Sequence, residues 1–199
     1  MSSLWRAIGD LKILLTGSSG FVGTNLAEKL VSLGHEVIGF DLFQPKEPVA
    51  SRYIYGNLLN ENDLTALLVD AVVHFAAQAR VEPSYTDPIG TYRTNVQATI
   101  NLLELCKRYD KRLVYASSEI IYGESDRYPC REHYTLRPDS PYAASKAAAD
   151  LLVQQCTDVR SVVVRSGMGY GPRSPPSQVV TKMLLKCMDG KPLLFPEGP

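Results

Sequence analysis

A tyrosine and a lysine lie four residues apart in the stretch SPYAASKAAAD, at Tyr142 and Lys146. Ser140 and Pro141 suit the first positions of a helix, and the alanines that follow favour its propagation. On a helix this spacing puts both side chains on one face, where the phenol and the ammonium can approach each other. The pair is either a packed ring beside a solvated lysine or an acid/base couple, and other motifs must decide.

A second candidate site is the glycine-rich stretch TGSSGFVG, in which Gly17, Gly20 and Gly23 follow an apolar run and precede an amphipathic segment. Between a strand and a helix, the first glycine permits a tight turn and the second lets the backbone approach a pyrophosphate. The third lets helix and strand pack closely. The helix N-terminus adds unpaired N–H groups and the positive end of its dipole. The spacing predicts a dinucleotide-phosphate site, with a plain strand-to-helix turn as the alternative.

An acidic residue, Asp41, ends the next apolar run, VIGFD. It follows the glycines by roughly 20 residues, the distance at which a carboxylate usually meets the adenosine ribose. A carboxylate there accepts hydrogen bonds from the ribose hydroxyls and repels a 2′-phosphate. No arginine follows directly in DLFQPK, so the sequence predicts NAD rather than NADP. The alternative for Asp41 is an ordinary solvated strand end.

The elements that must position these residues follow from hydrophobic periodicity. Apolar runs predict strands at 12–15, 36–41, 52–57, 71–77, 112–118 and 161–166, and helices are expected at 21–33, 61–68, 87–109, 140–156 and 178–192. Leu26, Leu30 and Leu33 form the apolar stripe of the first helix, and Asn60 or Asn62 caps the second. This alternation predicts an α/β fold, a doubly wound parallel sheet of the Rossmann type that is covered on both faces.

Composition sets the class of protein and narrows its partners. The chain has 199 residues, 45% of them hydrophobic, and its 21 basic residues equal its 21 acidic ones. A neutral chain predicts neither nucleic acid nor an anionic membrane as the main partner. No run is long enough to span a bilayer, and MSSLWRAIGDLK lacks the order of a signal peptide. The scattered cysteines, without a CxxC pair, predict free thiols in a reducing compartment and no metal site. We therefore expect a cytoplasmic protein.

Seven motifs follow one another from Lys12 to about Pro192: TGSSGFVG, FD, HFAAQARV, DPIGTYRTNVQATINLLELC, SSEIIYG, YAASK and GYGPR. In this order they are very specific. The chain resembles the extended short-chain dehydrogenase/reductase family, in particular its NAD-dependent nucleotide-sugar epimerases and dehydratases. The resemblance implies bound NAD, a nucleotide-sugar substrate and a homodimer formed through the helices at 87–109 and 140–156.

The resemblance also implies roles for individual positions. Ser118, four before Tyr122, matches the family's catalytic Ser/Thr; Tyr142 matches its acid/base and Lys146 the partner of that tyrosine. His74 matches the strand end that passes the cofactor. The implied cofactor contacts are Gly17, Ser19, Gly20, Phe21, Val22, Gly23, Asp41, Asn57, Leu58, Phe75, Ala76, Ala77, Asn95, Ser117, Tyr142 and Lys146. The candidates for substrate contacts are Gln78, Arg80, Ser118, Glu119 and Arg173.

These residue types suit redox chemistry at a sugar carbon. A free tyrosine has a pKa of about 10 and is a poor base at neutral pH. An ammonium one helical turn away stabilises the phenolate, and so does a positively charged nicotinamide nearby; together they are expected to move the couple toward the working range of general acid/base catalysis. Lys146 can also hydrogen-bond the nicotinamide ribose, and the Ser118 hydroxyl can position the sugar oxygen and relay its proton. Tyr142 would then remove a hydroxyl proton while hydride passes to NAD⁺.

The reaction itself is narrowed by two positions next to Ser118. Dehydratases of the family carry a Glu two before the motif tyrosine, often preceded by an Asp, and here those places hold Ile120 and Glu119. Ile120 cannot remove a proton, so the sequence favours an epimerase, which needs only the Ser, Tyr and Lys. A dehydratase or reductase of the same family is the first alternative. A non-catalytic NAD-binding regulatory or scaffold protein is the second.

The C-terminal part departs from the family in one side chain and in length. Met168 replaces the Asn that holds the nucleotide-sugar diphosphate in FNVYGP, and methionine cannot make that hydrogen bond. The family continues well beyond GKPLLFPEG, where this sequence ends. We therefore expect an NAD-binding domain over 1–165, and only a partial C-terminal substrate lobe over 166–199.

Overall fold

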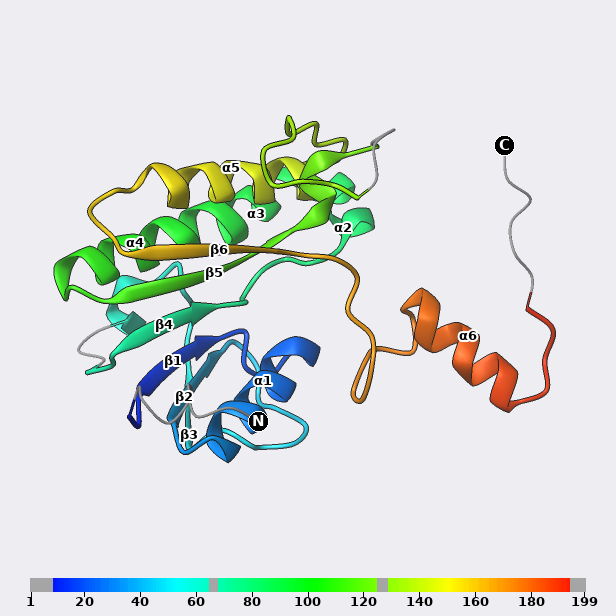
Figure 1. The fold of residues 1–199 in the computed structure, drawn as a ribbon, viewed down its shortest axis with the longest axis horizontal. Helices are drawn as coiled ribbons and strands as arrows, with labels where there is room; N and C mark the ends of the chain where they lie inside the picture. The colour runs from blue at the N-terminus through cyan, green and yellow to red at the C-terminus, as the bar shows by residue number, and fades with distance from the viewer. Residues whose placement is uncertain (1–8, 65–67, 125–128, 194–199) are drawn as a thin grey trace. The chain divides into compact units, whose positions relative to one another are not determined.

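The computed structural model describes residues 9–64, 68–124 and 129–193, in which six parallel strands form one sheet of order β3-β2-β1-β4-β5-β6 (Figure 1). The strands are β1 (Lys12–Thr16), β2 (Glu36–Asp41), β3 (Arg52–Tyr55), β4 (Ala71–His74), β5 (Arg112–Ser118) and β6 (Ser161–Ser166). The chain order reverses between β1 and β4, which is the switch point of a doubly wound sheet. The predicted fold class is confirmed.

Helical segments connect the strands, and two of them were not predicted from the sequence. The segments are α1 (Phe21–Ser32), η2 (Glu61–Leu64), α2 (Val81–Thr86), α3 (Pro88–Tyr92), η3 (Arg93–Gln97), α4 (Ala98–Arg108), η4 (Glu119–Tyr122), α5 (Pro141–Gln155) and α6 (Val179–Met188). Both α2 and η4 are single short turns, too brief to show a helical period. The predicted cap of α5 is present, because the Ser140 side chain accepts a hydrogen bond from the Ala143 N–H.

The prediction of one regular helix over 87–109 is wrong in its middle. Asp87 caps the start of α3, but η3 is a π-helical turn inserted before α4. Inside that turn the Asn95 carbonyl accepts the hydroxyl hydrogen of Thr99 at 2.6 Å. A π turn interrupts the ordinary ladder of hydrogen bonds and often marks a functional site. Side-chain hydrogen bonds of this kind are not visible in the apolar periodicity.

The helix predicted over 61–68 is a single 3-10 turn, η2, among the described residues; 65–67 lie outside them. Asn60 stands at its start and accepts a hydrogen bond from the Asn62 N–H at 3.2 Å. Of the two proposed caps, Asn60 is therefore the one that the structure supports.

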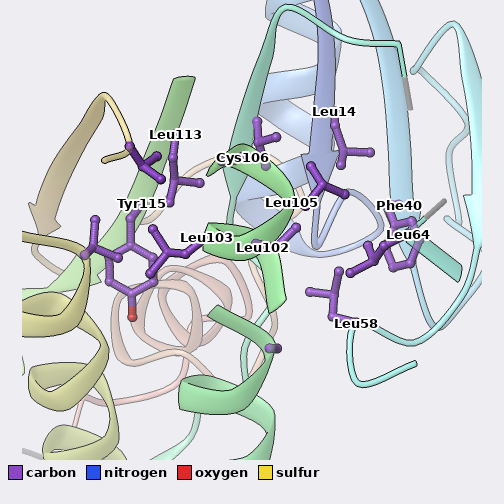
Figure 2. Close-up of a cluster of buried hydrophobic side chains, with 14 of the residues drawn as sticks. Leu14, Phe40, Leu58, Leu64, Leu102, Leu103, Leu105, Cys106, Leu113 and Tyr115 are labelled. Carbon is purple, nitrogen blue, oxygen red and sulfur yellow. The ribbon is translucent and has the colours of Figure 1, made fainter. Parts of the chain in front are cut away.

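The two faces of the sheet carry separate hydrophobic clusters. The larger one packs α4 and α5 against the strands and includes Leu14, Phe40, Leu102, Leu113 and Tyr115 (Figure 2). The smaller one packs α1 against the other face through Leu15, Ala27 and Val37, with Leu26 and Leu30 beside them. Leu33 does not complete the predicted stripe: it is 41% exposed at the end of α1.

The chain divides into two compact units, Met1–Gly167 and Met168–Pro199. The first holds the whole sheet and the helical segments up to α5, and the second holds α6. Within the described residues, no helix is long and apolar enough to cross a membrane.

Candidate active site

The predicted site residues of the first unit gather at the carboxyl ends of β1, β2, β4 and β5. In parallel α/β sheets this edge, beside the switch point between β1 and β4, is where ligands bind. The glycine-rich loop follows β1, Asp41 ends β2, Phe75 follows β4 and Ser118 ends β5. The topology therefore brings together residues that are about 100 positions apart in the sequence.

Two glycines of the loop are required by close contacts. Gly17 has a φ of +71°, and a Cβ on it would lie 2.6 Å from the Ala76 nitrogen at the end of β4. A Cβ on Gly23 would lie 2.0 Å from the Gly17 carbonyl oxygen. The structure thus confirms the tight turn and the close helix packing that the spacing predicted.

Gly20 differs from these two glycines, because a Cβ on it would be less hindered. It is exposed, its φ is −78°, and a Cβ would meet only the Gly17 oxygen, at 3.3 Å. Gly20 is the N-cap of α1 and supplies no side-chain hydrogen bond to the first turn. The half-buried Phe21 and the exposed Val22 begin that turn. A helix start without a capping side chain leaves N–H groups for an anion.

Asp41 is tied to the loop rather than being a simple solvated strand end. Its Oδ2 accepts a hydrogen bond from the Ser19 N–H at 2.9 Å, and its Oδ1 accepts one from the Phe43 N–H at 3.1 Å. The Ser19 hydroxyl in turn donates to the Phe43 carbonyl. Each carboxylate oxygen still has a second lone pair. Asp41 can therefore accept further hydrogen bonds from a ligand beside the loop.

The stretch after β3 places Asn57 at the surface and Leu58 in the core. The Asn57 side-chain oxygen accepts a hydrogen bond from the Leu59 N–H at 3.0 Å, which leaves its NH₂ group as the donor end of the side chain. The Leu58 carbonyl accepts a hydrogen bond from the Asn101 amide. Asn57 thus presents donors at the surface, whereas Leu58 acts in packing.

Asn95 holds the chain segment that follows β4. Its Oδ1 accepts from the Gln78 N–H at 2.8 Å, and its Nδ2 donates to the Gln78 carbonyl and to the Ser145 hydroxyl. The side chain is buried, and these protein groups use its hydrogen-bonding atoms. Asn95 therefore connects the half-buried segment of Phe75, Ala76 and Ala77 to α5. In this arrangement the Asn95 amide positions protein backbone, and its predicted contact with the cofactor stays a prediction.

Ser118, Tyr142 and Lys146 converge as predicted, but the electrostatics differ from the expectation. Burial raises the pKa of the half-buried Tyr142 phenol, and the nearby Ser118 hydroxyl lowers it by less. The Lys146 ammonium donates to the Ala116 carbonyl at 2.5 Å and lies 4.4 Å from the centre of the Tyr115 ring. Burial is therefore the larger effect on the Tyr142 phenol, and it acts against the stabilisation of the phenolate that is expected from Lys146 together with a charged nicotinamide.

The predicted substrate contacts are partly engaged in local structure. Gln78 uses its side-chain amide to hold the Arg80 backbone, while Arg80 itself is exposed at the start of α2. Glu119 is exposed just after Ser118, and a Cβ on Gly167 would lie 2.6 Å from its carboxylate. Ser117 is buried beneath this edge. Arg173 belongs to the second unit and has a φ of +68°.

His74 is a buried core residue with a defined tautomer. Thr99 donates its hydroxyl hydrogen to the Asn95 carbonyl, so at 3.2 Å it can only accept a hydrogen bond from His74 Nε2. The Nδ1 atom then accepts from the Thr16 hydroxyl, at 2.7 Å. Burial, with a smaller effect from the Lys146 charge, lowers the pKa of His74 to about 3. His74 is therefore neutral and links β1 and β4 to the π turn.

This link makes the stability of the fold depend on pH. Between pH 6.5, the ordinary pKa of histidine, and a pH of about 3, the pKa of folded His74, the unfolded chain binds a proton at His74 and the folded chain does not. Stability is therefore fully present above that range and is lost as the pH falls through it. We expect the loss to approach about 1.4 kcal/mol per pH unit. Urea unfolding at a series of pH values, with His74→Gln as the comparison, measures it. Equal pH slopes for both proteins would contradict the assignment.

The sequence analysis missed several residues that support the site. Ser145 and Thr99 hold Asn95, and Asp150 is a fully buried carboxylate one helical turn after Lys146. One signal was available: residues four apart share a helix face, which relates Thr99 to Asn95 and Asp150 to Lys146. Polar residues at these spacings inside otherwise apolar helices point to internal hydrogen bonds.

A doubly wound sheet with this loop at its switch point defines a dinucleotide-binding α/β protein. The family model described as "NAD dependent epimerase/dehydratase family" matches residues 13–198. The chain belongs to this family, which confirms the resemblance found in the sequence.

Individual relatives agree with this assignment. The chain is 32% identical over 211 residues to the uncharacterized UDP-glucose epimerase YtcB of Bacillus subtilis strain 168, covering 94% of this chain and 66% of that protein. It is 29% identical to DesIV, a dTDP-glucose 4,6-dehydratase from Streptomyces venezuelae whose structure was solved with NAD and TYD bound. The match has a TM-score of 0.79 and covers 90% of this chain and 62% of that one. The structure of MoeE5 in complex with UDP-glucose and NAD is of a protein 31% identical to this chain. The match has a TM-score of 0.77 and covers 93% of this chain and 63% of that one. The chain thus spans less than two thirds of each.

Proposed function

We propose that the chain takes part in NAD-dependent epimerisation of a nucleotide sugar through a transient keto intermediate. The observation that carries this proposal is the placement of Ser118, at the end of β5, beside the Tyr142 phenol and the buried Lys146, at the sheet edge that also holds the phosphate loop. Family membership supports the same class of chemistry.

The residues present fit NAD. The uncapped start of α1 with its open Gly20 suits a pyrophosphate, and Asp41 suits a ribose with free hydroxyls and disfavours a 2′-phosphate. Phe75, Ala76 and Ala77 line the neighbouring strand end. When bound, NAD⁺ supplies an acceptor for hydride and, once reduced, a donor.

The chain's own residues handle the proton and the charge. Tyr142 takes the proton of a sugar hydroxyl as the carbon beneath it loses hydride, which leaves a ketone. Ser118 donates to the same oxygen and keeps it near the phenol. The positive charge of Lys146 stabilises the phenolate form of Tyr142. Return of the proton from Tyr142, with hydride returning to the opposite face of the ketone, gives the epimer.

An epimerase fits these residues better than a dehydratase. Dehydration also needs a base for a second carbon, and Ile120 in η4 carries no such group. Glu119 is the neighbouring carboxylate and lies against the backbone of Gly167. Mass spectrometry separates the two reactions, because an epimer keeps the mass of its substrate whereas a dehydrated product loses one water.

The test begins with the cofactor content of the purified, unfolded protein, followed by a panel of UDP- and dTDP-sugars. Stoichiometric released NAD⁺ or NADH and a product of unchanged mass are expected. A protein that binds NAD but turns over no sugar would favour the regulatory or scaffold alternative. A protein that neither contains nor binds NAD would overturn the proposal.

The second unit is proposed to begin a substrate-binding lobe, with the domain boundary near residues 165–168. The division of the chain at Gly167 supports this boundary. Met168 provides no hydrogen bond for a diphosphate, so Arg173 is the candidate anion contact of this unit. We also propose a cytoplasmic location, because scattered cysteines without a CxxC pair fit a reducing compartment.

We also propose a homodimer formed through α4 and α5, which contact each other on one face of the sheet (Figure 1). The outer stripe of α5 exposes Ala148 and Leu151, the latter to 49%, and small apolar residues allow close helix approach. Light scattering is expected to give twice the chain mass of 22.0 kDa. Leu151→Lys should shift the mass to that of a monomer, while the exposed change Lys29→Gln on α1, which covers the other face of the sheet, should not. A monomeric unmodified chain would contradict the proposal.

A further inference from the structure

Lys146 occupies an unusual position for a charged side chain. It is 5% exposed, and its ammonium donates a hydrogen bond to a neutral backbone carbonyl, that of Ala116. An isolated buried ammonium is costly unless an opposite charge lies near it. The groups that face it are Tyr142 on the same helix, Tyr115 on β5, and the neutral His74 on β4. None of these supplies a negative charge at neutral pH.

Asp150 is the carboxylate that can compensate this charge. It lies one helical turn after Lys146 on α5, on the same buried face, and is fully buried. Residues four apart on a helix are neighbours. The two side chains do not form a direct ion pair, so their interaction acts through space in a medium of low dielectric constant, where charges are weakly screened.

Asp150 is itself held in the ionised state by Arg165 on β6. The guanidinium binds the carboxylate with both arms, Nε to Oδ2 at 2.9 Å and Nη2 to Oδ1 at 2.8 Å. Its remaining nitrogen donates to the Tyr122 hydroxyl and to the Glu132 carbonyl, both at 2.7 Å. A bidentate arginine pair of this kind is strong and geometrically fixed. The carboxylate therefore keeps its charge although it has no contact with water.

We propose that Asp150, kept ionised by Arg165, is the counter-charge that holds Lys146 protonated in its buried site, and so acts as a positioning residue for the Tyr142 couple. Its catalytic consequence rests on the proposed function, whereas its electrostatic effect on Lys146 does not. The direction of the pKa shifts agrees: burial lowers the pKa of Lys146 to about 8, and Asp150 opposes that fall. Asp150 has a lowered pKa in spite of burial, with Arg165 as the main stabilising partner.

The test is the titration of Lys146 itself. The NMR resonance of its Cε carbon, assigned by its loss in Lys146→Met, is followed with pH in the unmodified chain and in Asp150→Asn. The variant is expected to titrate about one pH unit lower, a tenfold fall in proton affinity. Gln154→Leu is the matched control, since it removes a neutral hydrogen bond to the same carboxylate and leaves the charge pair intact. An unchanged titration in Asp150→Asn would overturn the proposal.

Two further measurements keep the test decisive. If Asp150→Asn fails to fold, Asp150→Glu retains the charge and should keep the Lys146 titration within a few tenths of a pH unit of the original; a full shift in this variant would overturn the proposal. If turnover is found, the alkaline limb of the kcat profile should move to lower pH in Asp150→Asn in step with the Lys146 titration. If the Lys146 titration shifts in Asp150→Asn but the chain turns over no sugar, the counter-charge role of Asp150 is supported and only the proposed function is contradicted.

Discussion

Tyr142→Phe is expected to lower epimerase turnover by about 10²- to 10⁴-fold, the usual contribution of a positioned general acid/base. The substitution removes one oxygen, the phenolic atom that lies near the Ser118 hydroxyl and would exchange the proton with the sugar. The ring stays, so the packing of α5 is preserved. Turnover is measured at saturating nucleotide sugar, together with the NAD content of the same preparation.

The NAD content should remain close to that of the unmodified protein, because the phosphate loop and Asp41 are untouched. Tyr85→Phe is the matched control: it removes a phenol oxygen that donates to the Asp139 carbonyl, just before the cap of α5. This variant should keep its turnover. Full activity in Tyr142→Phe would show that another group handles the proton.

The sequence predicted the features that depend on local chemistry and periodicity. Alternating apolar runs gave the parallel sheet, because strands buried on both faces need continuous apolar residues. Glycine spacing predicted the turn at Gly17, where a positive φ and the nearby Ala76 backbone exclude a side chain. Ser140 was recognisable as a cap since its hydroxyl replaces a missing backbone acceptor. These features are set by a few adjacent residues.

The remaining features depend on contacts between distant segments. The π turn of η3 joins Asn95 to Gln78 and Ser145, which lie 17 and 50 residues away. Asp150 ends the stretch SPYAASKAAAD on α5, whereas its partner Arg165 lies 15 residues further along the chain, on β6, and no sequence motif relates the two. The balance of burial and hydrogen bonding at Tyr142 likewise needs the folded chain. Charge and burial act through space, so sequence spacing alone could not give their direction.

Gly20→Val is expected to abolish most NAD binding while leaving the fold intact. Gly20 has an ordinary φ of −78° and one neighbour, the Gly17 oxygen, at 3.3 Å from the added Cβ, so the folded chain tolerates a side chain with a small adjustment. That side chain would fill the space beside the uncapped start of α1. Hydrogen bonds to charged groups are worth about 1.5–3 kcal/mol each. Loss of one or two of them costs about 3 kcal/mol, or roughly 10²-fold in affinity.

Gly23→Ala provides the comparison, because its added Cβ would meet the Gly17 oxygen at 2.0 Å inside the fold. It should lower the urea midpoint of unfolding, whereas Gly20→Val should leave that midpoint near the original value. Isothermal titration with NAD⁺ and urea unfolding of both variants separate the two effects. If Gly20→Val binds NAD⁺ normally, the pyrophosphate does not lie at the start of α1. If both variants lower the urea midpoint equally, Gly20 is required for folding in the same way as Gly23, and the loop has a structural role only.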